Sequence, residues 1–586
     1  MIYTNFYRGE IKMDKTPHRL TKNKLRSLPM TMLFSGILGA ILFIAIYGVK
    51  ILNPTYDDWL FAGGDLTQHY TGWLFFRRSD WHFPYGLIDC ILDDIKISHM
   101  YTDSIPLFAL FFKLLSPILP ETFQYFGIWG LFCFICSGAL SSMLIHKFNK
   151  NPIFCVLGSV VYVLCPAVFH RMYGHESLAG HYIIILGLVL WAYQNHSYKR
   201  KWMNLCMPAI LWGVTGIITV YTHMYFLPLM YCCLLASAIT DMLHHKKVIR
   251  PISCAVSLTV FSLLALWGVG AFYGKGSSAS YGLGECSANL NTFWNGMTLN
   301  RADIFIGYPA KASRFLKELP VGPWQFEGFA YLGLGVILAV IISLPICLIC
   351  LFRRKEGFAV SLKKALSHYK WYILAFSVSF LVALFFAVSP KCTFNDKVIY
   401  TINYPESITN ILAIFRASGR FAWFNDYLIF TAVMFVLSKI DSKKIMIALL
   451  SVCLCVQVAD MSDLLASRKW YKETQTYVSP LTDPRWEEFA DECDKIVILP
   501  YDVPGNVSYT FGKFANDHDL SLNHFHIARP PIDEIIQKYF ENIDKIARGD
   551  GDPNTIYLFL SAEYIPEGAP NIDIYEMDGY TVVRCR

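Results

Sequence analysis

Long apolar runs recur along this sequence, and they constrain its fold more than any other feature. A helix needs about 20 apolar residues to cross the hydrocarbon core of a bilayer. Eleven runs approach or reach that length with little charge: 30–49, 122–145, 152–169, 181–195, 203–221, 225–241, 252–272, 329–352, 371–388, 421–438 and 445–459. Because backbone polar groups must be satisfied within a membrane, the runs predict an all-α polytopic bundle of about 11 transmembrane helices.

Basic side chains indicate how this bundle is oriented. Only 16% of the residues are charged, against roughly 25% in soluble domains. Cytoplasmic loops carry an excess of Lys and Arg, and basic clusters fall between alternate runs, near 146–147, 199–201, 244–247, 353–364 and 439–444. We therefore expect a multi-pass plasma-membrane protein with a basic cytoplasmic N-terminus over 1–29. The net charge of +6 belongs to this pattern and indicates no nucleic-acid partner.

The same orientation divides the chain into two domains. A transmembrane domain over 30–460 would carry three large outer loops, 50–121, 273–328 and 389–420. The apolar segment 105–119 contains Lys113 and Pro117, and a span there would invert every later basic loop, so we interpret it as interfacial or re-entrant.

The remaining residues, 461–586, predict a small extracytoplasmic α/β or α+β domain. They contain no span-length apolar run. Short β-type runs begin at Lys495, Thr555 and Tyr580, and 530–547 has the pattern of an amphipathic helix. Cys493 and Cys585 are the only cysteines of this region, and whether they form a disulfide stays open.

The loop after the first run places an acid and a histidine close together. Asp65 and His69 are four residues apart, with Gln68 between them, and would share one face of a helix. A carboxylate beside the membrane can act as general base toward an acceptor hydroxyl. The alternative is a solvated acidic loop with a Gly-Gly turn. Asp103, further along, is expected to cap the helix that follows it.

A second polar cluster lies between the third and fourth runs. Arg171, His175, Glu176 and His181 crowd a short loop beside two strongly apolar segments. Polar groups at membrane depth are costly, so such clusters usually have a function. Glu176, His175 and His181 could bind a divalent cation, Mg²⁺ or Mn²⁺, although no cofactor is certain. The alternative is a hydrogen-bonded cap on the next span.

A third cluster stands at the start of the run 421–438. Arg416 and Arg420 are four residues apart, so a helix would align both guanidinium groups. Arginine forks match phosphate oxygens, and the pair would lie at the depth of lipid headgroups. The alternative is two anchoring side chains that extend toward water from an aromatic belt.

Together these features resemble the GT-C superfamily of membrane glycosyltransferases, which use polyprenyl-phosphate-linked sugars. The segments 64–69, 327–333 and 415–421 look more narrowly like a bacterial family of unknown function near these enzymes. The resemblance implies that Asp65 is the base, and that Glu176 is the second-loop acid that some members use for a metal. It also implies that Arg416 and Arg420 bind the phosphate of the lipid carrier.

The expected function is therefore an inverting transfer of a sugar, on the outer face of the membrane, from a polyprenyl-phosphate donor. The acceptor would be a cell-envelope glycan or polymer, and membrane lipid surrounds the site. Asp65 and Glu176 are the expected catalytic residues. The expected substrate-binding residues are Gln68, His69, Arg171, His175, Arg416 and Arg420. The alternatives are a transporter or flippase of a lipid-linked saccharide and a non-catalytic protein of envelope assembly.

Overall fold

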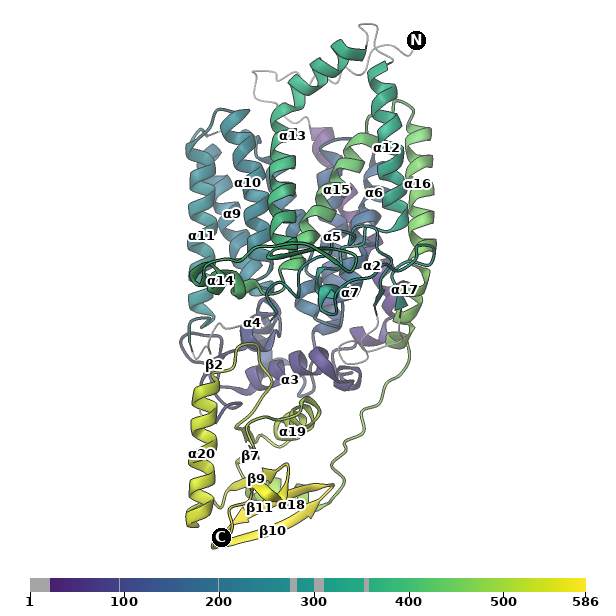
Figure 1. The fold of residues 1–586 in the computed structure, drawn as a ribbon. Helices are drawn as coiled ribbons and strands as arrows, with labels where there is room; N and C mark the ends of the chain where they lie inside the picture. Colours follow the sequence, from purple (N-terminus) through teal and green to yellow (C-terminus); the bar gives the residue numbers. More distant parts are fainter. Residues whose placement is uncertain (1–21, 94, 199, 274–281, 300–309, 353–357) are drawn as a thin grey trace.

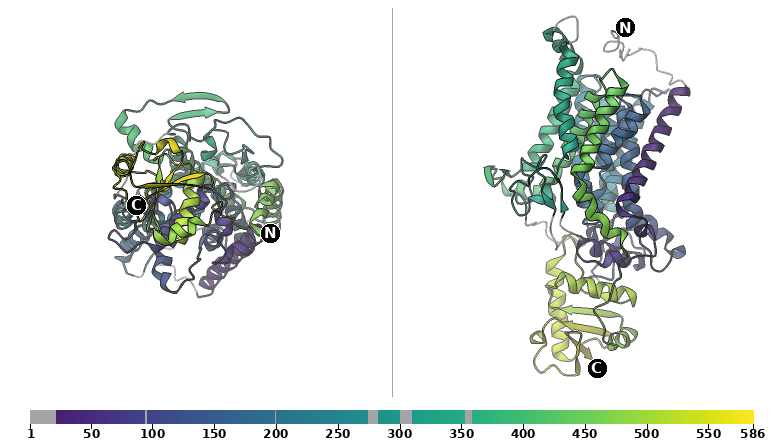
Figure 2. Two further views of the ribbon diagram at one scale, coloured as in Figure 1. Left: turned by 90° about the horizontal axis from the view of Figure 1, so that it is seen from below. Right: turned by 90° about the vertical axis from the view of Figure 1, so that its right-hand side faces the viewer.

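The protein consists of a helical bundle with a small α/β domain beneath it (Figure 1). The structure is a computed structural model and describes residues 22–93, 95–198, 200–273, 282–299, 310–352 and 358–586. The expected basic N-terminus up to residue 21, and basic residues at 199 and 353–355, lie outside these ranges. Figure 1 and the right-hand view of Figure 2 show the C-terminal domain at one end of the bundle and the start of α2 at the other.

Eight helices among the described residues are long and apolar enough to cross a membrane, so the chain has the character of a membrane protein. The count of eleven is not reached: α6 (Pro152–Val163) and the apolar part of α12 (Leu334–Phe352) are shorter, and α16 (Lys443–Asp460) bends by 60° into 462–472. The helix α6 is short because Pro166 starts the separate helix α7 (Pro166–Arg171). The span-length helices are α2 (Lys22–Tyr47), α5 (Phe126–His146), η5 (Glu176–Ala179) with α8 (Tyr182–Tyr193), α9 (Met203–Thr222), α10 (Phe226–Leu243), α11 (Ile249–Gly268), α13 (Phe358–Val388) and η8 (Ser418–Phe421) with α15 (Ala422–Leu437).

Small residues let the first two spans pack closely. A Cβ atom on Gly39 of α2 would lie 2.4 Å from the carbonyl oxygen of Phe134 on α5. One on Gly138 of α5 would lie 2.4 Å from the carbonyl oxygen of Ser35 on α2. Close backbone approach at small residues is a general means of helix association in membranes. Glycine is therefore required on both sides of this interface.

Helices of the segment 50–121 lie between the bundle and the C-terminal domain (Figure 1). They are α3 (Gly64–Arg78) and the ten-residue α4 (Pro106–Leu115), which is too short to span. The ammonium of Lys113 lies 4.1 Å from the ring centre of Phe76, so this charge is covered rather than inserted in lipid. Asp103 does not cap α4, contrary to expectation: the N-cap is Ile105, and Pro106 begins the helix.

The C-terminal domain is a mixed five-stranded sheet with helices. The strand order is β10-β11-β9-β7-β8, in which β7 runs parallel to β9 and β8, and β10 and β11 form an antiparallel hairpin. The predicted strands at 495, 555 and 580 and the predicted helix at 530–547 are all present. Cys493 and Cys585 are both buried free thiols. The elements are α18 (Arg485–Glu492), β7 (Lys495–Leu499), α19 (Gly505–Asp517), β8 (Ser521–Leu522), α20 (Ile532–Arg548), β9 (Thr555–Phe559), β10 (Ile572–Met577) and β11 (Tyr580–Cys585).

Short elements fill the connections between spans. The hairpin β5–β6 and the helix α14 project to the side of the bundle near its lower end (Figure 2). The residues of β6 are all exposed. The elements are β1 (Leu87–Ile88), β2 (Ile97–Ser98), β3 (Thr298–Leu299), β4 (Ala310–Lys311), β5 (Lys391–Phe394), β6 (Lys397–Thr401), α14 (Glu406–Leu412) and α17 (Ser462–Ala466).

Candidate functional site

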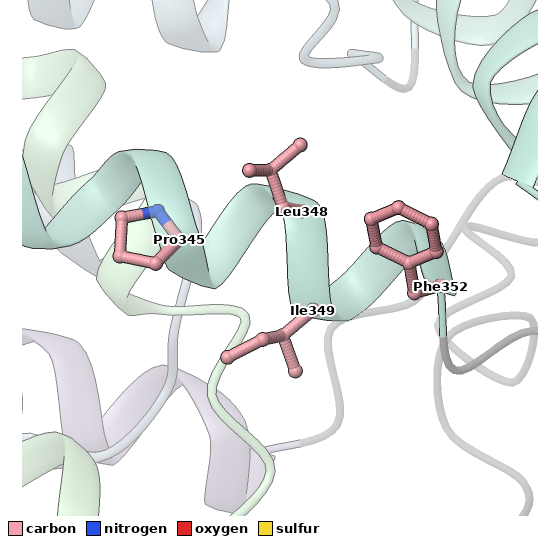
Figure 3. Close-up of a pocket in the computed structure, with 4 residues that line it drawn as sticks. All are labelled: Pro345, Leu348, Ile349 and Phe352. Carbon is pink, nitrogen blue, oxygen red and sulfur yellow. The ribbon is translucent and has the colours of Figure 1, made fainter.

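An apolar hollow on α12 is not the place for chemistry. It is lined by Pro345, Leu348, Ile349 and Phe352, which all lie along one helix (Figure 3). None of these side chains can donate a proton, hold a charge or bind a metal. The groups that can do so gather instead where α3 meets the loops at the lower end of the bundle.

The helix α3 begins at a turn that only glycine adopts readily. Gly63 and Gly64 have φ angles of +99° and +65°. The backbone N–H of Gly63 donates to Oγ1 of Thr67 at 2.8 Å, which fixes the first turn. Asp65 is acidic in that turn, where a negative charge favours the helix dipole. The expected helix is therefore present, and Asp65 and His69 share a face of it.

His69 is bound by the acid of the second cluster. Its Nδ1 makes a hydrogen bond and an ion pair with Oε2 of Glu176, and both side chains are buried. The indole N–H of Trp129 donates to the backbone oxygen of Glu176 at 2.8 Å and holds this turn in place. Burial would lower the pKa of His69, but the carboxylate of Glu176 raises it to about 9. His69 is therefore an imidazolium at neutral pH.

Asp65 stands beside this pair with a perturbed carboxyl group. Burial raises its pKa to about 6, although the positive charge of His69 lowers it. The negative charges of Glu176, Asp103 and Glu327 add to the increase, so four acids from separate parts of the chain act on one another here. Gln68, one residue before His69, is buried within α3.

Asp103 is surrounded by two further histidines. Its carboxylate lies 3.8 Å from Nε2 of His175 and 3.4 Å from Nε2 of His223. The rings of His69, His175 and His223 follow one another, with centres 5.0 Å and 5.2 Å apart. Burial would raise the pKa of Asp103, but the hydrogen bond from His223 and the nearby positive charges lower it. Asp103 is therefore ionised.

Among the residues that the structure describes, two groups of side chains could hold a metal ion. They are Asp65 with His69 and His175, and Asp103 with His175 and His223; the ligand atoms within each group lie within 4.8 Å of one another. Imidazole and carboxylate together suit divalent transition metals. In the first group Glu176 accepts from Nδ1 of His69, which is the usual outer-shell arrangement of a metal-binding histidine.

The expected trio of Glu176, His175 and His181 is not one of these groups. His181 lies elsewhere in the core: its Nδ1 is 3.2 Å from Oη of Tyr427, and its ring is 4.7 Å from that of Trp423. It faces the apolar interior because it precedes the buried start of α8. Glu176 acts on His69 instead of offering its carboxylate beside His181.

A buried cluster of two arginines and one acid adjoins these groups. Nη2 of Arg171 donates to Oε2 of Glu327 at 2.6 Å, and Nε of Arg420 donates to the same oxygen at 3.0 Å. Burial would raise the pKa of Glu327, but Arg171 and Arg420 together hold it at about 2. The guanidinium of Arg420 also lies 4.2 Å from the ring centre of Tyr225. One carboxylate thus neutralises half of the positive charge.

Arg416 and Arg420 do not lie on one helix, contrary to what their spacing indicated. Arg416 lies between two short 3-10 helices, η7 (Ala413–Phe415) and η8, so no continuous helix aligns the two side chains. Arg416 is exposed, whereas the side chain of Arg420 is only 8% exposed and bonds to Glu327. The contact with Glu327 sets the position of Arg420, and a local spacing rule could not reveal it.

Comparison with known proteins places the chain in a family. Residues 36–462 match the family model described as a domain of unknown function (DUF6311). The chain belongs to the DUF6311 family. Residues 485–586 match the model of the DUF6311 C-terminal domain. No curated protein matches the chain. Asp65, Glu176 and Arg420 therefore lie in the first DUF6311 unit, while α19 and the five-stranded sheet lie in the second.

Sequence reasoning missed three members of this DUF6311 site. Glu327 lies in η6 (Gln325–Gly328), just before the expected span 329–352. A charged residue beside such an apolar run is a signal by which the sequence could have indicated a functional role. His223 falls in the short turn between α9 and α10, where a lone histidine is as consistent with a structural role as with a functional one. Asp103 was assigned to a cap. The role of each of these three residues depends on contacts with side chains far away in the sequence.

Proposed function

We propose that this DUF6311 protein is a membrane glycosyltransferase of the GT-C type. It would transfer a sugar, with inversion, from a polyprenyl-phosphate donor to a cell-envelope acceptor on the outer face of the plasma membrane. One observation supports this most: Asp65, the His69–Glu176 pair and the Arg171–Glu327–Arg420 cluster converge at one end of an apolar helical bundle. A base and a phosphate-binding cation are the two groups that this transfer requires.

In the proposed reaction Asp65 accepts the proton of the acceptor hydroxyl. The hydroxyl oxygen forms a bond to the anomeric carbon while the bond from that carbon to the phosphate oxygen breaks. The phosphate leaves with the bonding electrons, and Arg420 holds it. The exposed Arg416 would meet the lipid phosphate from the membrane side. One displacement inverts the anomeric configuration, so one carboxylate suffices, unlike the paired acids of glycosidases.

A metal is not needed for this scheme, because a phosphate leaves without strong acid assistance. A divalent cation held by either histidine group would add positive charge beside the departing phosphate. The hydrogen bond between the buried side chains of His69 and Glu176 fixes the histidine beside Asp65. Fixed orientation toward the hydroxyl is what makes a general base effective.

The test is transfer by the purified full-length protein, with a radiolabelled polyprenyl-phosphate sugar and cell-envelope acceptors. We expect Asp65→Asn to lose at least roughly a hundredfold in rate, the usual contribution of a general base. Asp80→Asn is the matched control, because Asp80 is an exposed acid just beyond the same helix. If Asp65→Asn transfers sugar as fast as the wild type, this mechanism is wrong.

A further inference from the structure

The helix that carries Asp65 has a second face, and the C-terminal domain packs on it. A Cβ atom on Gly512 of α19 would lie 3.1 Å from Cγ2 of Thr71. The rings of Phe75 and Phe525 are 5.7 Å apart. Nη1 of Arg78 donates to the backbone oxygen of Ala515 at 3.2 Å. Figure 1 shows α19 directly beneath α3.

The direction of α19 brings Tyr509 toward the Asp65 end of α3. Residues 512 and 515 contact Thr71 and Arg78, so α19 residues earlier in the chain lie nearer the start of α3. Tyr509 precedes Gly512 by three residues and therefore shares its face. Burial, and to a smaller extent the negative charge of Asp65, raise the pKa of Tyr509 to about 12. The side chain is half-buried, so part of its ring remains accessible.

A loop of the C-terminal domain, residues 523–529, passes the segments that carry Asp103 and Arg416. Asn523 fixes its start, because the backbone N–H of Ile498 donates to Oδ1 of Asn523 at 2.7 Å. Its end is fixed to the bundle: the N–H of Ala528 donates to the oxygen of Tyr101 at 2.8 Å, and Arg529 donates to the oxygen of Ile414 at 2.9 Å. The loop therefore runs from α3, past the turn before Asp103, to the segment before Arg416.

His526 lies in the middle of this loop and is exposed. The residue before it, Phe525, packs on α3, and Ala528 is bonded to Tyr101, so His526 lies between α3 and the turn before Asp103. Partial desolvation and the positive charge of His69 lower the pKa of His526. A neutral imidazole offers one donor and one acceptor, and a tyrosine offers an apolar ring with a polar tip. Hydroxyl-rich sugar rings are recognised by this combination of a flat apolar face and hydrogen-bonding groups.

We propose that Tyr509 and His526 of the C-terminal domain bind the carbohydrate acceptor and present its hydroxyl to Asp65. This rests on the proposed function and adds the side from which the acceptor arrives. The Arg416 and Arg420 side faces the spans, where a lipid donor would lie. Tyr509 and His526 come from the C-terminal domain, which lies beyond the end of the bundle (Figure 1), so an acceptor bound by them would approach Asp65 from outside the spans. Both residues are acceptor-binding residues, since Asp65 alone takes the proton.

The experiment uses the full-length protein at saturating donor and varied acceptor, with soluble envelope oligosaccharides as the probe. We expect Tyr509→Ala and His526→Ala each to raise the KM for acceptor by roughly tenfold, as the loss of one contact of about 1.4 kcal/mol would do. The KM for donor and the melting temperature should stay unchanged. His518→Ala is the matched control, because His518 pairs with Glu487 elsewhere on the same domain.

Two further readouts separate this inference from the function on which it rests. Tyr509→Phe keeps the ring and should retain most of the acceptor affinity if stacking dominates. A wild type that transfers sugar, with an unchanged acceptor KM in both alanine variants, contradicts the acceptor role alone. A wild type that binds the oligosaccharides, as measured by tryptophan fluorescence, but never transfers sugar contradicts the proposed function alone. A wild type that neither binds the oligosaccharides nor transfers sugar contradicts both the acceptor role and the proposed function.

Discussion

Replacing Glu327 by glutamine should destabilise the protein strongly, because it leaves two buried guanidinium groups without a counter-charge. The side chains of Arg171 and Arg420 are 1% and 8% exposed, and that of Glu327 is 15% exposed. Removing one partner of a buried ion pair typically costs about 3–5 kcal/mol. The pKa of Glu327 leads to a similar figure.

That pKa falls from an ordinary value of 4.5 to about 2, a difference worth about 3 kcal/mol at roughly 1.4 kcal/mol per pH unit. Since the folded-state pKa is depressed, the stabilisation is fully present above about pH 4.5 and is lost as the pH falls toward 2. Glutamine resembles the protonated acid, so Glu327→Gln should abolish this part of the pH dependence.

The assay is thermal unfolding of the detergent-solubilised full-length protein between pH 3 and 7. Glu327→Gln should lower the melting temperature at pH 7 by at least a few degrees. Glu285→Gln is the matched control, because the Glu285–Lys391 pair is 45% and 35% exposed and should contribute less than about 1 kcal/mol. Adding Arg171→Met to Glu327→Gln should recover part of the loss, since one unpaired charge is removed. Equal melting temperatures for Glu327→Gln and the control would refute the reasoning.

Three other outcomes are expected. His175→Ala, which removes the residue shared by both histidine groups, should lower the Mn²⁺ or Zn²⁺ retained after dialysis, measured by elemental analysis against His518→Ala; equal retention would exclude both groups as metal sites. Gly138→Val should destabilise the α2–α5 interface by about 1–3 kcal/mol, seen as a lower melting temperature. Arg78→Ala removes bonds to two backbone oxygens of the C-terminal domain and should speed proteolysis of residues 478–481 roughly tenfold; an unchanged cleavage rate would mean that these bonds do not hold the domain in place.

Local patterns predicted much of the secondary structure. The spacing of Asp65 and His69 indicated a helix, and α3 is that helix because two glycines start it and its apolar side chains are covered on both faces. Three strands and the long helix of the C-terminal domain were also recognisable, since their periodicities are strong. The segment 105–119, which Lys113 and Pro117 interrupt, forms the ten-residue helix α4 followed by one 3-10 turn.

The partners within the site could not be predicted in the same way. Glu176 lies 107 residues from His69, and Glu327 lies 156 residues from Arg171, so only the packed bundle brings them together. The spacing of Arg416 and Arg420 suggested a shared helix face, but the backbone forms two separate short turns there. Spacing rules describe neighbours on one element; they carry no information about which loops meet.

The segment joining the two DUF6311 units determines how far they can separate. The N–H of Tyr477 donates to Asp58 in the bundle, and the N–H of Thr482 donates to Asp578 in the C-terminal domain. The four residues between these anchors can extend by only about 14 Å. A domain that detaches from α3 therefore stays at an effective concentration in the millimolar range, and rebinding is an intramolecular step. Weak individual contacts along α3 are then enough to keep it docked most of the time.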